Sequence, residues 1–166
     1  MQAYEEYISE LGYYDVFVFG SNKNDGFHGA GSAGFATFNK SGNHWREEGY
    51  AGWPHGAKGA WNVKGCGEGF QKGKIGKSYA LPTVTKAGAK RSRTPEEISI
   101  SVKSLYAFAL SQPQLRFLIA QDAKMGLNGY SPDEMADMFL CMKIPNNVFF
   151  FRPFYDILVK KVNFNR

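Results

Sequence analysis

The sequence predicts an α/β fold with a mixed, largely parallel central sheet. Four short apolar runs read as strands, and they are continuous rather than alternating, which is typical of strands buried on both faces. Helical patterns with clear start signals lie between the later runs, and such alternation favours parallel pairing. The 166 residues are enough for one hydrophobic core, so we expect a single domain over residues 1–166.

The predicted strands are recognised by their apolar residues and by the turn-forming residues beside them. The first strand is expected to stop at the turn Gly20-Ser21-Asn22, because glycine, serine and asparagine favour turns. The four runs span Asp15–Phe19, Ser78–Leu81, Leu115–Ala120 and Val148–Phe151.

Two helices are predicted from their capping sequences. Thr94-Pro-Glu-Glu97 is a capping box with proline at the first helical position, and an apolar stripe at helical spacing follows over 98–109. Ser131-Pro-Asp-Glu134 repeats this arrangement, with a methionine-rich stripe over 135–142 that we interpret as core. Small and apolar residues predict a third helix over about 31–39.

The segment at about 41–77 differs from the rest of the chain. It is rich in glycine and aromatic residues and has little periodicity. A stretch of this length without clear elements is long for a compact domain. We therefore predict an irregular insertion that has a functional role or contains short hidden elements.

Composition and the N-terminal sequence exclude several classes of protein. No run of about 18 apolar residues occurs, so no transmembrane helix is expected. The first residues are acidic and lack a basic region followed by an apolar run, so no signal peptide is expected. Cys66 and Cys141 lack metal-ligand spacing, and two reduced thiols are a simpler interpretation than a disulfide. We expect a cytoplasmic protein without a metal or cofactor, and the sequence leaves its oligomeric state open.

A glycine-rich segment follows the first strand. Gly29, Gly31 and Gly34 have the spacing G-x-G-x-x-G, and glycines before a helix let backbone N–H groups approach an anion. The dinucleotide-binding fingerprint is not matched, because eight residues separate Gly20 from Gly29 and no acidic residue closes a second strand. We predict a phosphate-type ligand at this loop, and the alternative is a purely structural glycine loop.

Three segments are expected to meet at the carboxyl edge of the sheet, where open α/β sheets bind ligands. Gly20-Ser21-Asn22 follows the first strand, Pro82-Thr83 follows the second, and Gln121–Tyr130 follows the third. The last segment has two glycines before a capped helix, so it repeats the arrangement that follows the first strand. Two such loops at one edge predict a cleft.

Five motifs occur in order along most of the chain. They are Phe19-Gly-Ser-Asn22, His28-Gly-Ala-Gly-Ser-Ala33, Ser78-Tyr-Ala-Leu-Pro-Thr83, Gly126-Leu-Asn-Gly-Tyr130 and Asn147-Val148. In these motifs the chain resembles a macro-domain-like family found among bacterial and phage-related proteins. The resemblance implies a three-layer α/β/α sandwich and a cleft that binds ADP-ribose or a related nucleotide. It leaves open whether the chain is an ADP-ribosyl hydrolase or a phage-type binder that sequesters a signalling nucleotide without turnover.

The resemblance also implies which residues contact the ligand. Asn22 matches an asparagine that faces the distal ribose, and the two glycine loops match those beside the diphosphate. The sequence departs from the family pattern by placing an acid and a lysine, Asp122 and Lys124, at the cleft mouth, and a phosphorylated nucleotide remains the expected ligand. The expected ligand-binding residues are Gly20, Ser21, Asn22, Gly29, Ala30, Gly31, Lys124, Gly126, Leu127, Asn128, Gly129 and Tyr130.

Hydrolysis in such a cleft needs an activated water and charge stabilisation. The expected catalytic residues are Asn22, Asp122 and His28, with Asp122 or His28 as the base. Asp122 equally suits a loop acid that caps a nearby turn. The ring of His28 equally suits a hydrogen bond to a backbone carbonyl.

Charge suggests a different class of function. The net charge is +5, and basic residues crowd the segment 58–93, which contains Lys72, Lys74, Lys77 and Arg91. Basic residues mixed with aromatic residues are typical of nucleic-acid binding, so the alternative is a nucleic-acid-binding or interaction protein. A solvated basic surface without any partner is the simplest interpretation of the same charges.

Overall fold

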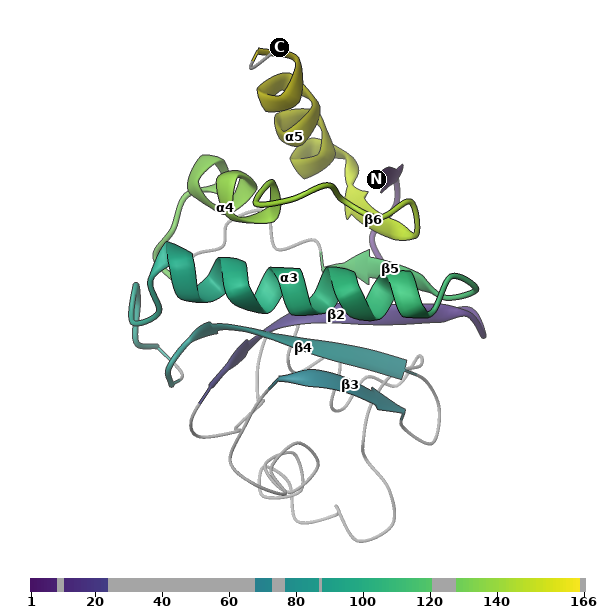
Figure 1. Ribbon diagram of the computed structural model, residues 1–166, viewed down its shortest axis with the longest axis horizontal. Coiled ribbons are helices and arrows are strands. Elements are labelled where there is room, and N and C mark those ends of the chain that lie inside the picture. The colour runs from purple at the N-terminus through teal and green to yellow at the C-terminus, as the bar shows by residue number, and fades with distance from the viewer. Residues whose placement is uncertain (9–10, 24–67, 73–76, 87, 121–127, 165–166) are drawn as a thin grey trace, which may run out of the picture.

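The protein has a mixed α/β fold built on one six-stranded sheet (Figure 1). The computed structural model describes residues 1–8, 11–23, 68–72, 77–86, 88–120 and 128–164. The strands are β1 (Gln2–Tyr4), β2 (Asp15–Asn22), β3 (Gly69–Lys72), β4 (Lys77–Val84), β5 (Arg116–Ile119) and β6 (Val148–Phe151). The helices among these residues are α3 (Pro95–Ser111), α4 (Pro132–Phe139) and α5 (Arg152–Phe164). The predicted α/β class is confirmed.

The strand order in the sheet is β1-β6-β5-β2-β4-β3. Each neighbouring pair is parallel except β3 and β4, which pair antiparallel. The long strand β2 lies in the middle, between β5 and β4. The largely parallel sheet that the sequence predicts is therefore confirmed.

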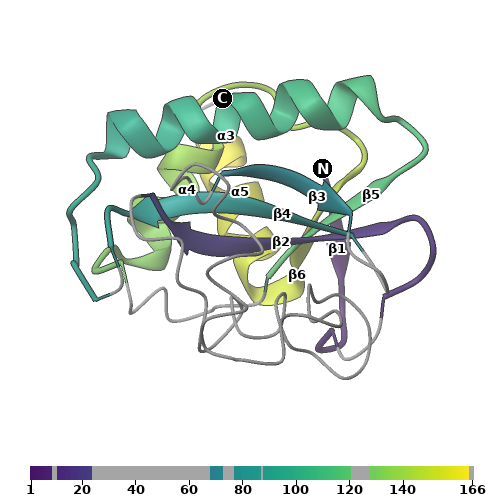
Figure 2. The same ribbon diagram turned by 90° about the horizontal axis from the view of Figure 1, so that it is seen from below.

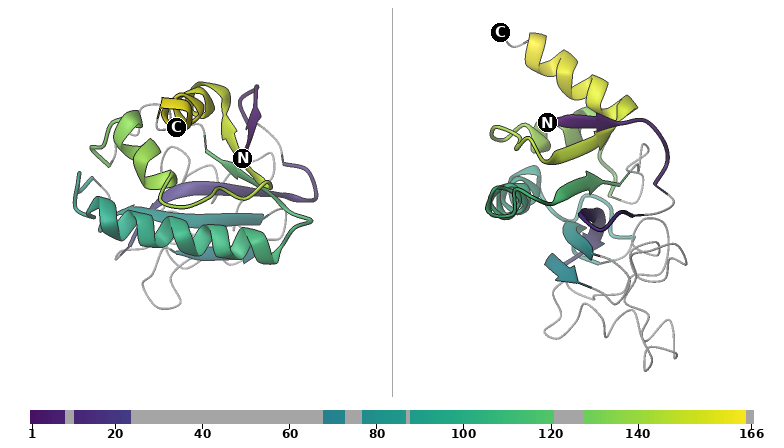
Figure 3. Two further views of the ribbon diagram at one scale, coloured as in Figure 1. Left: turned by 45° about the horizontal axis from the view of Figure 1, so that its top comes forward. Right: turned by 90° about the vertical axis from the view of Figure 1, so that its right-hand side faces the viewer.

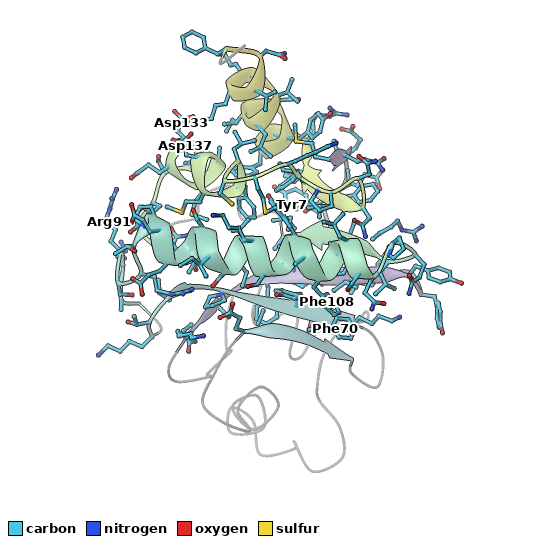
Figure 4. All side chains as sticks on the ribbon, viewed as in Figure 1. Tyr7, Phe70, Arg91, Phe108, Asp133 and Asp137 are labelled. Carbon is cyan, nitrogen blue, oxygen red and sulfur yellow. The ribbon has the colours of Figure 1, made fainter. Side chains whose placement is uncertain are left out.

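Helix α3 lies over one face of the sheet (Figure 2), and the main hydrophobic core lies on this face beneath α3 and α4. Phe108 of α3 lies beside Phe70 of β3, with ring centroids 5.0 Å apart (Figure 4). Phe139 of α4 meets Phe150 of β6 edge to face, with centroids 5.3 Å apart. The apolar stripes of both helices therefore pack against this face.

The opposite face of β2 is also apolar. Phe17 and Phe19 point to this face, both are buried, and their rings stack with centroids 6.5 Å apart. The continuous apolar run is thus buried on both faces, as predicted. Helix α5 lies beyond the β1–β6 edge (Figure 3), and its Phe154 and Leu158 belong to the main core. The described residues supply no helix to the second face, so the third layer of the sandwich remains a prediction.

The two predicted capping boxes are present. The hydroxyl of Thr94 accepts a hydrogen bond from the Glu97 N–H at 3.1 Å, and the Glu97 carboxylate accepts from the Thr94 N–H at 3.0 Å. Ser131 and Glu134 form the same pair of bonds at the start of α4. None of the helices among the described residues is long and apolar enough to cross a membrane.

The predicted stripe of α4 extends too far. The helix ends at Phe139, with the Leu140 N–H bonded to Ala136 as its last helical bond, and Met142 is 43% exposed. The chain turns there to enter β6, so helical spacing in the sequence continues beyond the helix itself.

Three elements were not predicted, and two strands are longer than predicted. β1 and β3 are edge strands of three and four residues, and strands this short carry no periodic signal. Helix α5 has a weak signal, since Pro153 follows its first residue and Phe154 and Leu158 are one helical turn apart. The prediction of a turn at Gly20-Ser21-Asn22 is wrong. These residues continue β2, because the strand stays paired with β4 beyond a register shift after Ser21.

We expect the capping carboxylates to make stability depend on pH in the acid range. The pKa of Glu97 lies below its usual value of 4.5 because its carboxylate accepts from the Thr94 backbone N–H and side chain; the pKa of Glu134 is lowered by Ser131 and Arg91. A depressed folded-state pKa adds stability above the unfolded-state pKa, and this stability is lost as the pH falls through the folded-state value.

Urea unfolding followed by circular dichroism, between about pH 6 and about pH 3, measures this effect. The urea midpoint of the wild-type protein should fall on acidification, and that of a Glu97→Gln/Glu134→Gln variant should fall less. Glu96→Gln is the matched control, because Glu96 is an exposed first-turn acid outside the capping box. Equal slopes in the double variant and the control would contradict the prediction.

Candidate functional site

The carboxyl ends of β2 and β5 diverge at a topological switch point. Their ladder ends at Val18 and Ile119, and the Ala120 N–H donates a last hydrogen bond to the Val18 carbonyl at 2.8 Å. β2 continues beyond this point in its ladder with β4 as far as Asn22. The chain leaves β2 toward β4 and leaves β5 toward β6, in opposite directions along the sheet. Open α/β sheets bind ligands in the crevice that such a divergence creates.

The end of β2 presents a glycine between buried neighbours. Gly20 is exposed, whereas Phe19 and Ser21 on either side are buried. The nearest described atom to a Cβ built on Gly20 is Thr83 Oγ1, at an ordinary contact distance of 3.5 Å. The peptide backbone at Gly20 is therefore accessible for close approach by a ligand.

Two polar residues complete the end of this strand. Ser21 and Asn22 are 3% and 5% exposed. The backbone N–H of the following Lys23 donates to the Val84 carbonyl at 2.8 Å, and its ammonium group pairs with Glu68 at 2.8 Å. These contacts hold the chain against β4 as it leaves the sheet.

The predicted loop 126–130 is described from Asn128 onward, and it docks on the connection between β4 and α3. The Asn128 carbonyl accepts from the Arg91 N–H at 2.6 Å, and the Asn128 side chain accepts from the Tyr130 N–H at 2.9 Å. Gly129 adopts a φ of +81°, and a Cβ there would lie 3.0 Å from the Cβ of Lys90. Tight packing and the left-handed backbone both require glycine at this position.

Tyr130 and Arg91 reinforce the same docking. The Tyr130 hydroxyl donates to the Arg93 carbonyl at 2.6 Å, and the Arg91 guanidinium lies 4.7 Å from the Tyr130 ring centroid. Arg91 also forms a two-pronged ion pair with Glu134 at the start of α4. The side chains of Asn128 and Tyr130 are buried in these structural contacts.

Arg93 connects the end of β4 to α3 and was not singled out from the sequence. Its side chain is buried, and it donates to the Pro82 carbonyl at 2.5 Å, the Ser101 hydroxyl at 3.1 Å and the Glu97 carbonyl at 3.3 Å. Each acceptor is a neutral oxygen. Its position directly before a capping box was the only sequence signal of this role.

Tyr79 and Cys141 are among the described groups whose pKa is raised. Burial, together with the charge of Glu68, raises the pKa of Tyr79 to about 12. Burial raises the pKa of the Cys141 thiol, whose Sγ lies 3.8 Å from the Ser99 carbonyl. Both groups are therefore protonated near neutral pH, which fits structural roles rather than nucleophilic ones.

The structure places the predicted site residues only in part. Gly20, Ser21 and Asn22 lie together at the end of β2, and Arg93 connects them indirectly to Asn128–Tyr130 through Pro82 of the paired strand. The residues that lie outside the described part are His28, Gly29, Ala30, Gly31, Asp122, Lys124, Gly126 and Leu127, with the helix expected at 31–39 and most of the segment 41–77.

The described part of the basic segment 58–93 does not form one surface. Lys77 begins β4 at the amino edge of the sheet, whereas Arg91 lies beyond its carboxyl end. Arg91 and Arg93 are engaged in the structural contacts above. The basic residues that are close in the sequence therefore do not form a single continuous patch among the described residues.

No protein-family model matches this chain, and no curated protein matches its sequence.

Proposed function

We propose that the crevice between the carboxyl ends of β2 and β5 binds ADP-ribose or a related phosphorylated nucleotide. The divergence of these strands after Val18 and Ile119 is the observation that carries the proposal. The resemblance to macro-domain-like proteins supports the same edge of the sheet and a three-layer sandwich around it. The cytoplasm is the location we propose.

The chemistry of the described residues fits such a ligand. The open backbone at Gly20 allows close approach, and the buried polar residues Ser21 and Asn22 follow it directly. Arg93 brings a positive charge to the end of β4, where its hydrogen bonds go to three neutral oxygens, and the net charge of +5 favours an anion. Hydrolysis of an ADP-ribosyl linkage would use Asp122 or His28 as the base, and binding without turnover needs neither.

Calorimetric titration with ADP-ribose tests the proposal, with AMP, NAD and a short oligonucleotide as comparators. We expect a saturable ADP-ribose isotherm that weakens more than about tenfold in Gly20→Ala, because the added methyl group blocks close approach to the backbone. The substitution leaves the fold intact, since its nearest described neighbour is in ordinary contact. Tyr13→Leu, at the opposite edge of the sheet, is the control and should bind normally.

Absence of ADP-ribose binding by the folded wild-type protein, or equal affinity in Gly20→Ala, would overturn the proposed site. If binding is found, chromatography of an ADP-ribosylated peptide incubated with wild type and Asp122→Asn separates turnover from sequestration. Release of ADP-ribose by the wild type would establish a hydrolase, and loss of that release in Asp122→Asn would identify Asp122 as the base.

A further inference from the structure

We propose that the amino-terminal edge of the sheet binds single-stranded nucleic acid through a second site, which we call the tyrosine edge. It comprises Tyr13 and Tyr14 before β2, Lys77 at the start of β4 and Arg116 at the start of β5. Parallel strands begin at one edge and end at the other. The tyrosine edge is therefore remote from the crevice at the carboxyl ends of β2 and β5.

The two tyrosines present aromatic surface to solvent. Tyr13 is 75% exposed and Tyr14 is 47% exposed, and their rings meet edge to face with centroids 4.9 Å apart. By contrast Tyr79, Tyr106 and Tyr130 are buried. An exposed aromatic pair of this kind contributes little to the core and is suited to stacking on a planar ligand.

The turn that carries these rings is fixed in place. The Gly12 N–H donates to the Asp15 carboxylate at 2.7 Å, and the Asp15 N–H donates back to the Gly12 carbonyl at 3.1 Å. The Tyr14 carbonyl accepts from the Arg116 N–H at 2.8 Å, which ties the turn to β5. A ligand that stacks here does not have to order the turn first.

Two cations lie at this edge of the sheet, one of them against the Tyr13 ring. The Lys77 ammonium lies 4.4 Å from the Tyr13 ring centroid and also donates to the Tyr13 carbonyl. Arg116 bonds Asp15 through its Nε at 2.8 Å, while its side chain is 51% exposed and that of Asp15 only 14%.

Exposed rings beside cations match the two chemical parts of a single strand of nucleic acid. Bases stack on aromatic faces, and phosphates are attracted to lysine and arginine. An acidic peptide would use the cations and leave the rings without a role. The combination therefore favours a single-stranded nucleic acid over an acidic polypeptide.

Fluorescence anisotropy with a labelled oligothymidylate of about 15 nucleotides tests the proposal at about 50 mM salt. We expect binding that weakens about tenfold in Tyr13→Leu and further in Tyr13→Leu/Tyr14→Leu. Tyr13→Phe is the matched control: it keeps the ring, so it should retain wild-type affinity. Lys77→Gln should lower the slope of log affinity against log salt by about one.

Because Tyr13 and Tyr14 are exposed, the tyrosine variants should keep the wild-type thermal midpoint. Equal affinity of wild type and the double leucine variant would overturn the proposal, as would the absence of oligonucleotide binding. Displacement by polyglutamate as efficient as by unlabelled oligonucleotide would indicate an acidic peptide instead. The same variants should bind ADP-ribose as the wild type does. Failure of the nucleic-acid proposal can therefore be distinguished from failure of the proposed nucleotide site.

Discussion

Replacing Asn147 with aspartate is expected to lower the free energy of unfolding by about 3 kcal/mol. The side-chain amide of Asn147 donates to three backbone carbonyls, those of Ala109 at 2.8 Å, Gln112 at 3.1 Å and Leu115 at 3.1 Å. These carbonyls lie at the end of α3 and just before β5. A carboxylate of the same shape removes the donor and opposes three partial negative charges.

Asn146→Asp is the matched control, because Asn146 is the exposed neighbour and receives the same chemical change. Its unfolding free energy should change by no more than about 0.5 kcal/mol. Urea denaturation monitored by circular dichroism measures both variants. The carbonyl oxygens raise the folded-state pKa of the introduced carboxyl, so the penalty should shrink as the pH falls. Similar stability of the two variants would show that the three hydrogen bonds contribute little.

Replacing Arg93 with methionine is expected to lower the free energy of unfolding by about 2 kcal/mol. The substitution leaves the Pro82 carbonyl, the Ser101 hydroxyl and the Glu97 carbonyl without their donor in a buried site. Methionine fills much of the space, so the loss reflects hydrogen bonding more than packing. Because the Pro82 carbonyl belongs to β4 opposite Ser21, the same variant should also weaken ligand binding in the proposed crevice.

Arg91→Met is the control for this experiment. Arg91 lies two residues away, its side chain is 56% exposed, and its ion pair with Glu134 is at the surface. Exposed ion pairs stabilise proteins by at most about 1 kcal/mol. Arg93→Lys should fall between the two methionine variants, since lysine keeps the charge but not the forked donors. A larger loss in Arg91→Met than in Arg93→Met would contradict the assignment of the buried anchor.

The sequence predicted the part of the candidate site that lies on the strands. The apolar run at 15–19 located β2, and the polar residues after it lie at the predicted edge of the sheet, although they extend the strand rather than form a turn. Asn128 and Tyr130 were predicted to bind the ligand, and no pattern in the sequence indicated a structural role for them instead. Their structural contacts depend on Arg91 and Arg93, which are 37 residues earlier in the chain.

By itself the sequence determined the start of α3, the start of α4 and the central strands of the sheet. A capping box joins atoms three residues apart, so Thr94 and Glu97 carry the whole signal locally. A continuous apolar run likewise indicates a strand that is buried on both faces. Only the tertiary structure decided the strand order, the divergence of β2 from β5, and the anchoring roles of Arg93 and Asn147. The Asn147 anchor bonds a carbonyl 38 residues away, and β2 pairs with β5 between residues 101 apart in the chain, so both depend on how the strands pack beside one another.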